Sequence, residues 1–262
     1  MMFFSYEIFR QIKPTFLAIR LGNFFYFILI LFGTGWLISL YDLKIARGLA
    51  LLLAILSYIG IIVYGRELFS FGVTDIVISL YALYGFIALK YEKYIIAGIL
   101  FAFALTCKLL PGLFFSIILF AWTIKKGVGR KFIMPHLITI SVILLPFILW
   151  HPRGFLSSTI LYYLSYHAGG DSTSLYFFLP SLIKPVFQYA GAFAVLFILI
   201  YGIRNHKPCV SHPLGLSFVS YIIFTAFNKM IHLNYIWGIY CLGCTALIIR
   251  MFAKKDEVMR DV

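Results

Sequence analysis

Charged residues are scarce in this chain of 262 amino acids, and acidic ones are the scarcest. Only 12% of the residues are charged, with 9 Asp and Glu against 22 Lys and Arg, while 63% are hydrophobic. Water-soluble domains carry about 25% charged residues and about 45–50% apolar residues. This balance excludes an ordinary soluble globule and predicts a chain whose solvent is mostly lipid.

The sequence also lacks the short motifs that identify common soluble enzymes. It has no GxSxG, HExxH, Walker or GxGxxG pattern in a suitable context. Its 4 cysteines lie in or beside apolar runs, which does not suggest a secreted disulfide framework. The basic residues stand in short clusters between apolar runs, as the positive-inside rule expects of a multi-pass protein of the cell membrane. A nucleic-acid partner is therefore not predicted.

Long uncharged runs predict an all-α protein, a polytopic integral membrane helical bundle. A helix needs roughly 20 apolar residues to cross about 30 Å of hydrocarbon. We predict a transmembrane bundle over 21–252, between an amphipathic outer or interfacial segment at 1–20 and a cytoplasmic tail at 253–262. The predicted transmembrane segments, which an outer loop at 151–186 interrupts, are 21–41, 48–64, 73–89, 94–107, 109–124, 132–150, 187–203, 213–228 and 233–249.

The run from Tyr94 to Ile124 decides whether eight or nine segments cross. As one helix it would be about 46 Å long at 1.5 Å per residue, half again too long. It also holds Lys108 and Pro111, and proline disfavours helical geometry in the residue before it. We therefore expect two short helices that meet at a turn holding Lys108. Both topologies place the same number of basic residues on each side of the membrane, so the positive-inside rule does not decide between them. A lysine inside the bilayer costs about 2.5–3.5 kcal/mol, which favours nine segments and an outer N-terminus.

With nine segments, Lys108 reaches the outer side, where most of the other unusual polar residues also lie. Asp75 would stand in the first turn of a short helix, where it either caps the helix or contacts a substrate. Lys108 either snorkels to the interface or holds a phosphate. Lys229 and His232 are three residues apart and face the same way. The candidate residues for binding an anionic lipid headgroup are Arg66, Glu67, Asp75, Lys108, Lys229, His232 and Asn234.

Other polar stretches are assigned structural roles. Phe155–His167 has the pattern of an amphipathic helix at the membrane interface, followed by a Gly-Gly-Asp turn. His136, beside Pro135, is expected at the inner interface. No metal-binding residues are predicted.

Four stretches of the chain form an ordered set of motifs. They are FGVTDIV, YIIAGILFAFALTCKLLPGLFF, HPRGFLSSTILYYL with GGDSTSLYFFLP, and FNKMIHLNYIW, and they span roughly Gly65 to Trp237. The most telling pattern is AGxLxxxAxxxKxxP, which begins at Ala97 and includes Lys108 and Pro111. In this order the stretches resemble the membrane glycosyltransferases of the GT-C superfamily, close to family 87 and the polyprenyl-phosphate-mannose-dependent mannosyltransferases.

The resemblance implies a GT-C-like fold that transfers a sugar, mannose or another hexose, from a polyprenyl-phosphate donor to an acceptor on the outer face. In this family a carboxylate deprotonates the acceptor hydroxyl, and cations stabilise the departing phosphate. Lys108, Lys229 and His232 match phosphate positions, and Asp75 and Glu67 match the acidic loop. The implied partners are membrane lipid, the lipid-linked sugar donor and a glycan, lipid or protein acceptor. No cofactor besides the donor is predicted, and a divalent cation is compatible with this chemistry.

The chain departs from the family at its start. It lacks the first transmembrane helix and the first outer loop, which carries the catalytic acidic residue in the family. We therefore expect the C-terminal portion of a glycosyltransferase, with its catalytic residue unassigned, inactive alone unless a partner chain supplies the loop. Two alternatives stay open. One is a non-catalytic accessory subunit that binds lipid phosphate, and the other is a transporter or flippase, because broken helices and buried lysines also mark transport sites.

Overall fold

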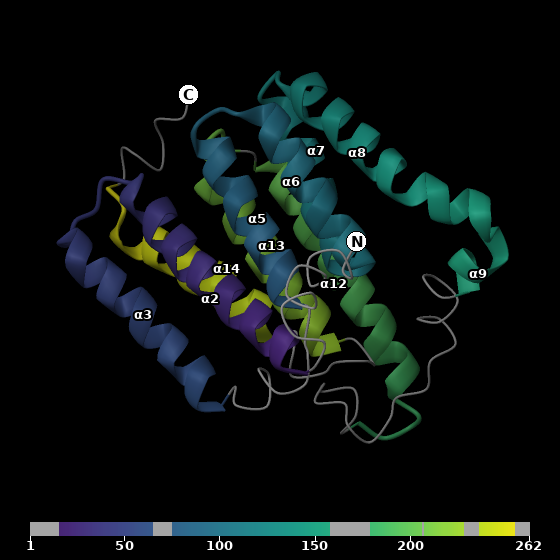
Figure 1. Ribbon diagram of the computed structural model, residues 1–262, viewed down its shortest axis with the longest axis horizontal. Coiled ribbons are helices and arrows are strands. Elements are labelled where there is room, and N and C mark those ends of the chain that lie inside the picture. Colours follow the sequence, from purple (N-terminus) through teal and green to yellow (C-terminus); the bar gives the residue numbers. More distant parts are fainter. Residues whose placement is uncertain (1–15, 65–74, 158–178, 206, 228–235, 255–262) are drawn as a thin grey trace.

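The computed structural model describes residues 16–64, 75–157, 179–205, 207–227 and 236–254. Within these ranges the regular elements are ten helices without a strand, which confirms the predicted all-α class (Figure 1). The helices are α2 (Phe16–Ser39), α3 (Arg47–Tyr64), α5 (Asp75–Lys90), α6 (Tyr94–Cys107), α7 (Leu109–Lys125), α8 (Gly129–Trp150), α9 (Pro152–Leu156), α12 (Lys184–Arg204), α13 (Ser211–Phe227) and α14 (Ile236–Phe252).

Each apolar segment of the sequence analysis overlaps one of these helices, with boundaries that differ by a few residues. The interfacial helix expected at Phe155–His167 falls mostly outside the described residues, and α9 covers only its beginning. Most of the interfacial segment predicted at 1–20, and most of the tail predicted at 253–262, also lie outside the described residues, which begin at 16 and end at 254.

The bundle is held together by apolar contacts between helices that are distant in sequence. α14 packs against α2, α3 and α5, while α13 packs against α7, α12 and α14. In the view of Figure 1, α12, α13 and α14 lie behind α2, α5 and α6. At the centre, the ring of Phe101 contacts Phe86 edge-on at 5.1 Å and Phe132 at 6.1 Å between centroids, which joins α5, α6 and α8.

α6 and α7 form a tight antiparallel hairpin, and the helix break expected at Lys108 is present. α6 ends at Cys107, α7 begins at Leu109, and Lys108 between them is extended, with φ −149° and ψ 110°. The two helices approach closely just after the turn, since a Cβ on Gly112 would lie 2.3 Å from the Cα of Leu105. Pro111 falls in the first turn of α7, where a missing N–H removes no helical hydrogen bond.

Two described helices are long and apolar enough to cross a membrane, at Leu21–Ser39 and Gly129–Trp150. The apolar stretches described in other helices are shorter, at 10–17 residues, for example Arg47–Leu56 of α3 and Phe193–Arg204 of α12. The two long helices differ in their surroundings: 50% of the apolar stretch in α2 is buried inside the protein, against 11% in α8. By length and composition alone, these two helices are weak evidence for a membrane location, and eight or nine crossings stay a prediction.

Candidate functional site

The structure places two of the predicted site residues. Arg66, Glu67, Lys229, His232 and Asn234 lie outside the described residues, so the structure does not test whether they share a site. Asp75 is the first residue of α5, in the helix turn where it was expected. Lys108 is the single residue between α6 and α7.

The backbone of Lys108 forms a hydrogen bond with each helix of the hairpin. Its backbone N–H donates to the carbonyl of Ala104 at 3.3 Å, and its own carbonyl accepts from the N–H of Gly112 at 3.2 Å. The residue is partly buried. The first N–H groups of a helix have no acceptor within that helix and carry partial positive charge. The turn therefore places a lysine directly before the start of α7, and a basic residue at a helix N-terminus is suited to an anion.

A buried polar contact fixes the hairpin against α8. The ring of His136 lies with Nδ1 3.0 Å from the carbonyl of Gly98 on α6 and Nε2 3.1 Å from the hydroxyl of Ser116 on α7. Because a carbonyl only accepts, Nδ1 donates, and the Ser116 hydroxyl shares its proton between Nε2 and the carbonyl of Gly112, 2.8 Å away. One side chain on α8 thus binds both arms of the hairpin.

The sequence analysis expected His136 at the inner interface and did not predict this contact. The side chain is fully buried among protein atoms, in the second turn of α8, which begins at Gly129 and continues through Pro135. The signal in the sequence was helical spacing: Phe132 and His136 are four residues apart and share one face. Ser116 was missed altogether, because a lone serine in an apolar run carries no distinctive pattern.

A close backbone approach makes this contact possible. A Cβ on Gly98 would lie 2.4 Å from the carbonyl oxygen of Phe132 and 3.4 Å from the backbone nitrogen of His136. Glycine is therefore required for α6 and α8 to cross at this distance. The rings of Phe120 and Phe132 lie 5.0 and 5.9 Å from the imidazole and surround it with apolar atoms.

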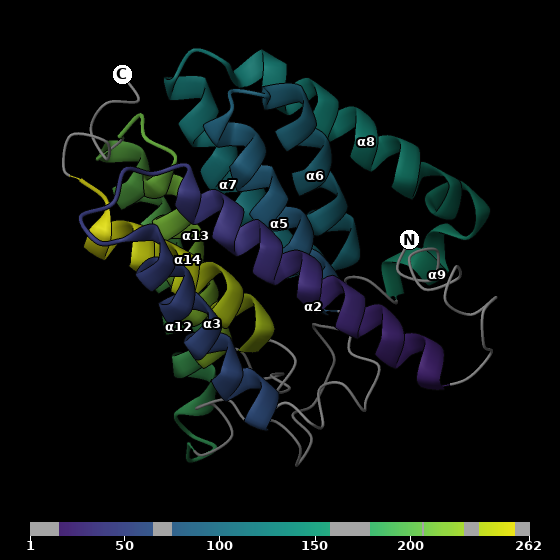
Figure 2. The same ribbon diagram turned by 60° about the vertical axis from the view of Figure 1, so that its left-hand side comes forward.

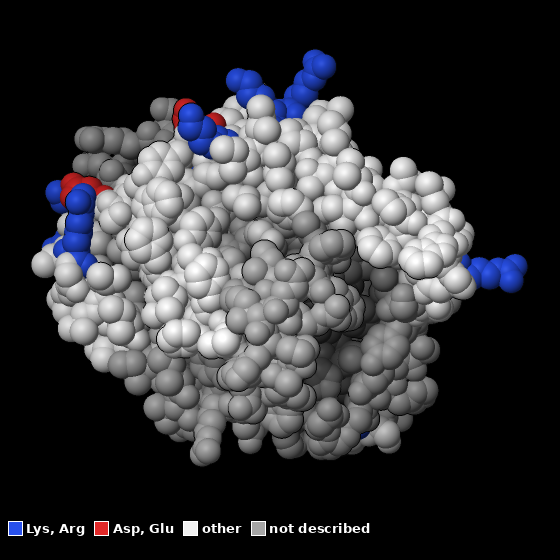
Figure 3. Space-filling view, viewed as in Figure 1, with Lys and Arg blue, Asp and Glu red and all other residues white. Residues whose placement is uncertain are grey.

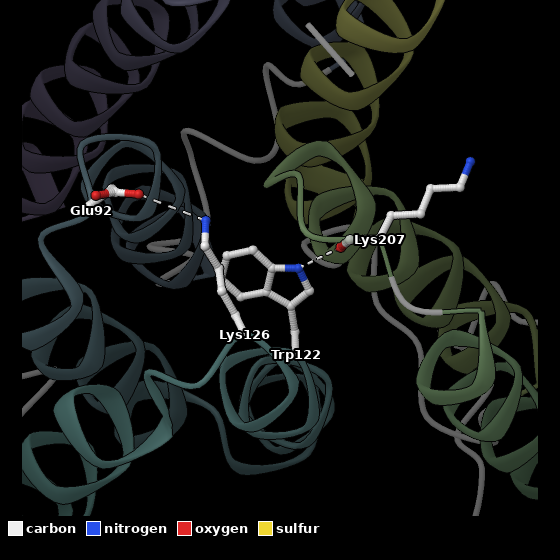
Figure 4. Close-up of polar contacts among 4 residues, drawn as sticks. All are labelled: Glu92, Trp122, Lys126 and Lys207. Carbon is white, nitrogen blue, oxygen red and sulfur yellow. Dashed lines mark hydrogen bonds and ion pairs between the residues drawn. The ribbon is translucent and has the colours of Figure 1, made fainter. Parts of the chain in front are cut away.

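Charged side chains gather at the opposite end of the hairpin from Lys108. Glu92, just before α6, lies 3.9 Å from the ammonium of Lys126, just after α7. The indole N–H of Trp122 donates to the carbonyl of Lys207 at 2.9 Å (Figure 4). The ammonium of Lys125 contacts the carbonyl of Ile203. These contacts bring the α5–α6, α7–α8 and α12–α13 connections to one end of the bundle.

The α2–α3 connection and the end of α14 are joined in the same way. Asp42 and Lys254 form an ion pair at 2.7 Å, and the N–H of Lys44 donates to the carbonyl of Phe252 at 2.7 Å. Lys90, at the end of α5, lies over the ring of Tyr41 at 4.4 Å. We call this end of the bundle the basic end. Since α5 reaches it with Lys90, its first residue, Asp75, lies at the other end, as Lys108 does.

On the face drawn in Figure 3, charged side chains stand at the margins. Most Lys, Arg, Asp and Glu side chains lie at its upper and left margins, one basic side chain projects at the right, and the described surface between them is almost entirely uncharged (Figure 3). Large exposed apolar side chains cover the helices, including Phe32 on α2, Leu56 on α3, Val142 on α8 and Phe197 on α12. In the described ranges, no group of His, Cys, Asp and Glu side chains could hold a metal ion.

Comparisons with known proteins supply no assignment: no family model, curated protein or solved structure matches the sequence. The similarity to GT-C glycosyltransferases therefore depends on the quoted motifs alone.

Proposed function

We propose that this chain is a multi-pass protein of the cell membrane that binds a polyprenyl-phosphate-linked sugar at Lys108 and takes part in its transfer, as the C-terminal portion of a GT-C-type glycosyltransferase. The observation that carries the proposal is the helix break at Lys108. An intramembrane lysine is rare, and it usually marks a polar or functional site. At the tip of the hairpin, Lys108 directly precedes the first N–H groups of α7, which favour an anion such as phosphate.

The outer surface of α8 supports the membrane location. After His136, none of its residues through Trp150 is buried, and Val142, Leu149 and Trp150 are 68%, 71% and 86% exposed. Contiguous apolar surface of this kind is rare on soluble monomers. In lipid the same side chains are solvated and α8 needs no protein partner.

The basic end supports the orientation with nine crossings. Because Glu92 and Lys126 lie together, both open ends of the hairpin lie at the same face of the membrane. Lys108, at the closed end, lies toward the opposite face. Each arm of 14 to 17 residues extends about 21–26 Å at 1.5 Å per residue. The basic end is then the inner face by the positive-inside rule, and Lys108 faces the outer side.

In this role the ammonium of Lys108 stabilises charge on the phosphate. When the bond between the sugar carbon and the phosphate oxygen breaks, the oxygen gains negative charge, and a preplaced cation lowers the barrier by meeting it. A carboxylate must accept the acceptor hydroxyl's proton. That carboxylate stays unassigned in this chain. Asp75 lies at the same end of the bundle as Lys108, and we propose for it a contact with the substrate.

Binding of the donor tests the proposal directly. Purified chain in nanodiscs is titrated with polyprenyl phosphate, and Lys108→Ala is expected to weaken binding roughly tenfold or more, since bonds to charged groups contribute about 1.5–3 kcal/mol. Lys131→Ala, which removes an exposed cation at the basic end, is the matched control and should bind normally. Equal affinity of the Lys108→Ala and Lys131→Ala variants would exclude the site.

Sugar transfer then separates the proposal from its alternatives. Membranes containing the chain are supplied with radiolabelled polyprenyl-phosphate sugar, and labelled product that disappears in Lys108→Ala supports the glycosyltransferase. Binding without transfer, even with added partner chains, indicates the accessory subunit. Solute or lipid translocation without transfer indicates a transporter or flippase.

A further inference from the structure

An apolar groove lies between α2 and α3, away from Lys108. Its α2 wall consists of residues spaced three and four apart along one face, and its α3 wall is Leu51. It has a volume of about 460 Å³ and is lined by Leu31, Phe32, Gly35, Trp36, Ser39 and Leu51. We call it the α2–α3 groove. The two helices diverge from the segment that joins them (Figure 2). The lining residues lie on the last turns of α2 and in the early part of α3.

The shape of the groove follows from Gly35. A Cβ at this position would lie 2.9 Å from Cδ1 of Leu51, so the missing side chain lets Leu51 pack directly against α2, and both residues line the groove. The rims are open to the surroundings, since Phe32 is 64% exposed and Leu51 40% exposed. The indole N–H of Trp36 donates to the hydroxyl of Tyr91 at 3.1 Å, which leaves the ring to line the groove.

The length of the groove matches one leaflet of a membrane. From Leu31 to Ser39 it runs about 12 Å along α2 at 1.5 Å per residue. The hydrocarbon of one leaflet is about 15 Å thick, half of the bilayer core. Ser39 is the last residue of α2 and lies beside the basic end, so the groove extends inward from the level at which headgroups would lie. Trp36 and Tyr91 form the kind of aromatic pair that is enriched at that level.

Positive charge stands at the mouth of the groove. Arg47 is one helical turn before Leu51 on the same face of α3, and Lys44 lies in the segment that joins the two helices; both side chains are exposed. Two of the described acidic residues lie at this end, and both are paired: Asp42 with Lys254 at 2.7 Å, and Glu92, next to Tyr91, with Lys126 at 3.9 Å. The mouth of the α2–α3 groove therefore carries net positive charge, and the groove itself is apolar. This combination is complementary to an anionic lipid, with its charged headgroup and apolar chain.

We propose that the α2–α3 groove binds one acyl chain of an anionic phospholipid, whose headgroup phosphate contacts Arg47 and Lys44. This lipid would occupy the leaflet at the basic end, opposite the site at Lys108. The inference rests on the membrane location proposed above, but not on sugar transfer. The lipid in the α2–α3 groove would stay bound while donor and product exchange at Lys108.

Native mass spectrometry of the purified full chain with added phosphatidylglycerol tests the groove. Wild-type protein should retain bound phosphatidylglycerol in preference to phosphatidylcholine. Leu51→Trp, which fills the groove, should lose most of this lipid, whereas Leu52→Trp, on the same helix but outside the groove, should retain it. Arg47→Gln should lower the affinity about fivefold, as expected for one basic residue near an anionic headgroup. Lys131→Gln is its control.

A measurement on the unmodified chain keeps the test independent of folding defects. A phosphatidylglycerol with a diazirine on its acyl chain should cross-link to peptides that contain the lining residues of α2 or Leu51. Cross-links confined to other helices, equal retention by Leu51→Trp and Leu52→Trp, or equal binding of both phospholipids would overturn the proposal. So would a cross-link between two chains through this face, which would identify a second copy as the occupant.

The outcomes separate this proposal from the function proposed at Lys108. Lys108→Ala should retain phosphatidylglycerol while it loses polyprenyl phosphate. A membrane-embedded chain that binds polyprenyl phosphate but no phosphatidylglycerol overturns the groove alone. Unchanged polyprenyl-phosphate binding by Lys108→Ala, with normal groove binding, overturns the function alone. A chain found wholly in the aqueous fraction overturns both.

Discussion

α6 and the part of α8 after His136 (137–150, here called the outer half of α8) are both strongly apolar, yet they have opposite surroundings. α6 buries seven residues, among them Ala97, Gly98, Ala102 and Ala104, whereas α8 buries none after His136. The difference lies in side-chain size. Small residues let helix backbones approach closely, and they are enriched where helices meet in membranes. The outer half of α8 carries bulky side chains such as Val142, Leu145 and Leu149, which extend outward. Hydropathy identifies both as helices, but residue size indicates which one faces protein.

The strongest way to break this comparison is to enlarge Gly98. Gly98→Val would place a Cβ only 2.4 Å from the carbonyl oxygen of Phe132, far inside van der Waals contact. A backbone atom cannot move aside as a side chain can, so we expect a loss of at least about 3 kcal/mol of stability. Thermal unfolding in detergent measures it. Val142→Ala, on the exposed half of α8, should change stability by less than about 0.5 kcal/mol. Similar melting temperatures for the two variants would contradict the assigned contact.

A charge on the outer half of α8 sharpens the comparison, because it distinguishes lipid from water. Val142 is 68% exposed, so Val142→Arg would cost little in a soluble protein. In the middle of a membrane-spanning helix an arginine costs about 2.5–3.5 kcal/mol. We expect Val142→Arg to lower the inserted fraction in a glycosylation-site insertion assay, with Val142→Leu as the control. Normal insertion of the arginine variant would contradict a lipid-facing α8.

The polar contact between the hairpin and α8 should contribute less than the close packing. Ser116→Ala removes the hydroxyl that lies between His136 and the carbonyl of Gly112, and leaves the buried ring nitrogen without this partner. An expected loss of about 1–3 kcal/mol follows. Urea or thermal unfolding measures it against Ser157→Ala, an exposed serine with only a local hydrogen bond. An equal and small change in both variants would show that the contact does not hold the hairpin.

The ion pair at the basic end should matter least. Asp42 and Lys254 are about half exposed, and exposed pairs contribute about 0.2–1 kcal/mol. Lys254→Gln should therefore lower the melting temperature slightly, and added salt should reduce the difference from wild type. A loss as large as that of Ser116→Ala would indicate that the pair organises this end of the bundle.

The sequence was sufficient for the helices and for the break at Lys108. Both depend on local rules: the length of an apolar run, and the effect of proline on the residue before it. It was not sufficient for His136 or for the exposure of α8, because these depend on which helices meet. Burial of His136 requires Gly98 and Ser116, which are 38 and 20 residues away in sequence. No period within one helix reports such a contact.

The candidate site was predicted only in part for the same reason. Lys108 stood out because a single lysine interrupts an apolar run and proline follows it. That Asp75 shares its end of the bundle follows from the reversal of direction between α5 and α6, which a count of segments already predicts. The α2–α3 groove depends on the contact of Leu51 with Gly35 and on the angle between two helices, neither of which can be read from hydropathy.

The packing of α14 has a consequence for the order in which the chain is made. Phe252 and Lys254 bind the segment after α2, and α14 lies against α2, α3 and α5. These three helices are synthesised well before α14, which packs against all of them. During translation their apolar faces must be shielded by lipid or by a chaperone until α14 arrives. A ribosome that stops before Ile236 would therefore release a chain whose first helices lack their final neighbour.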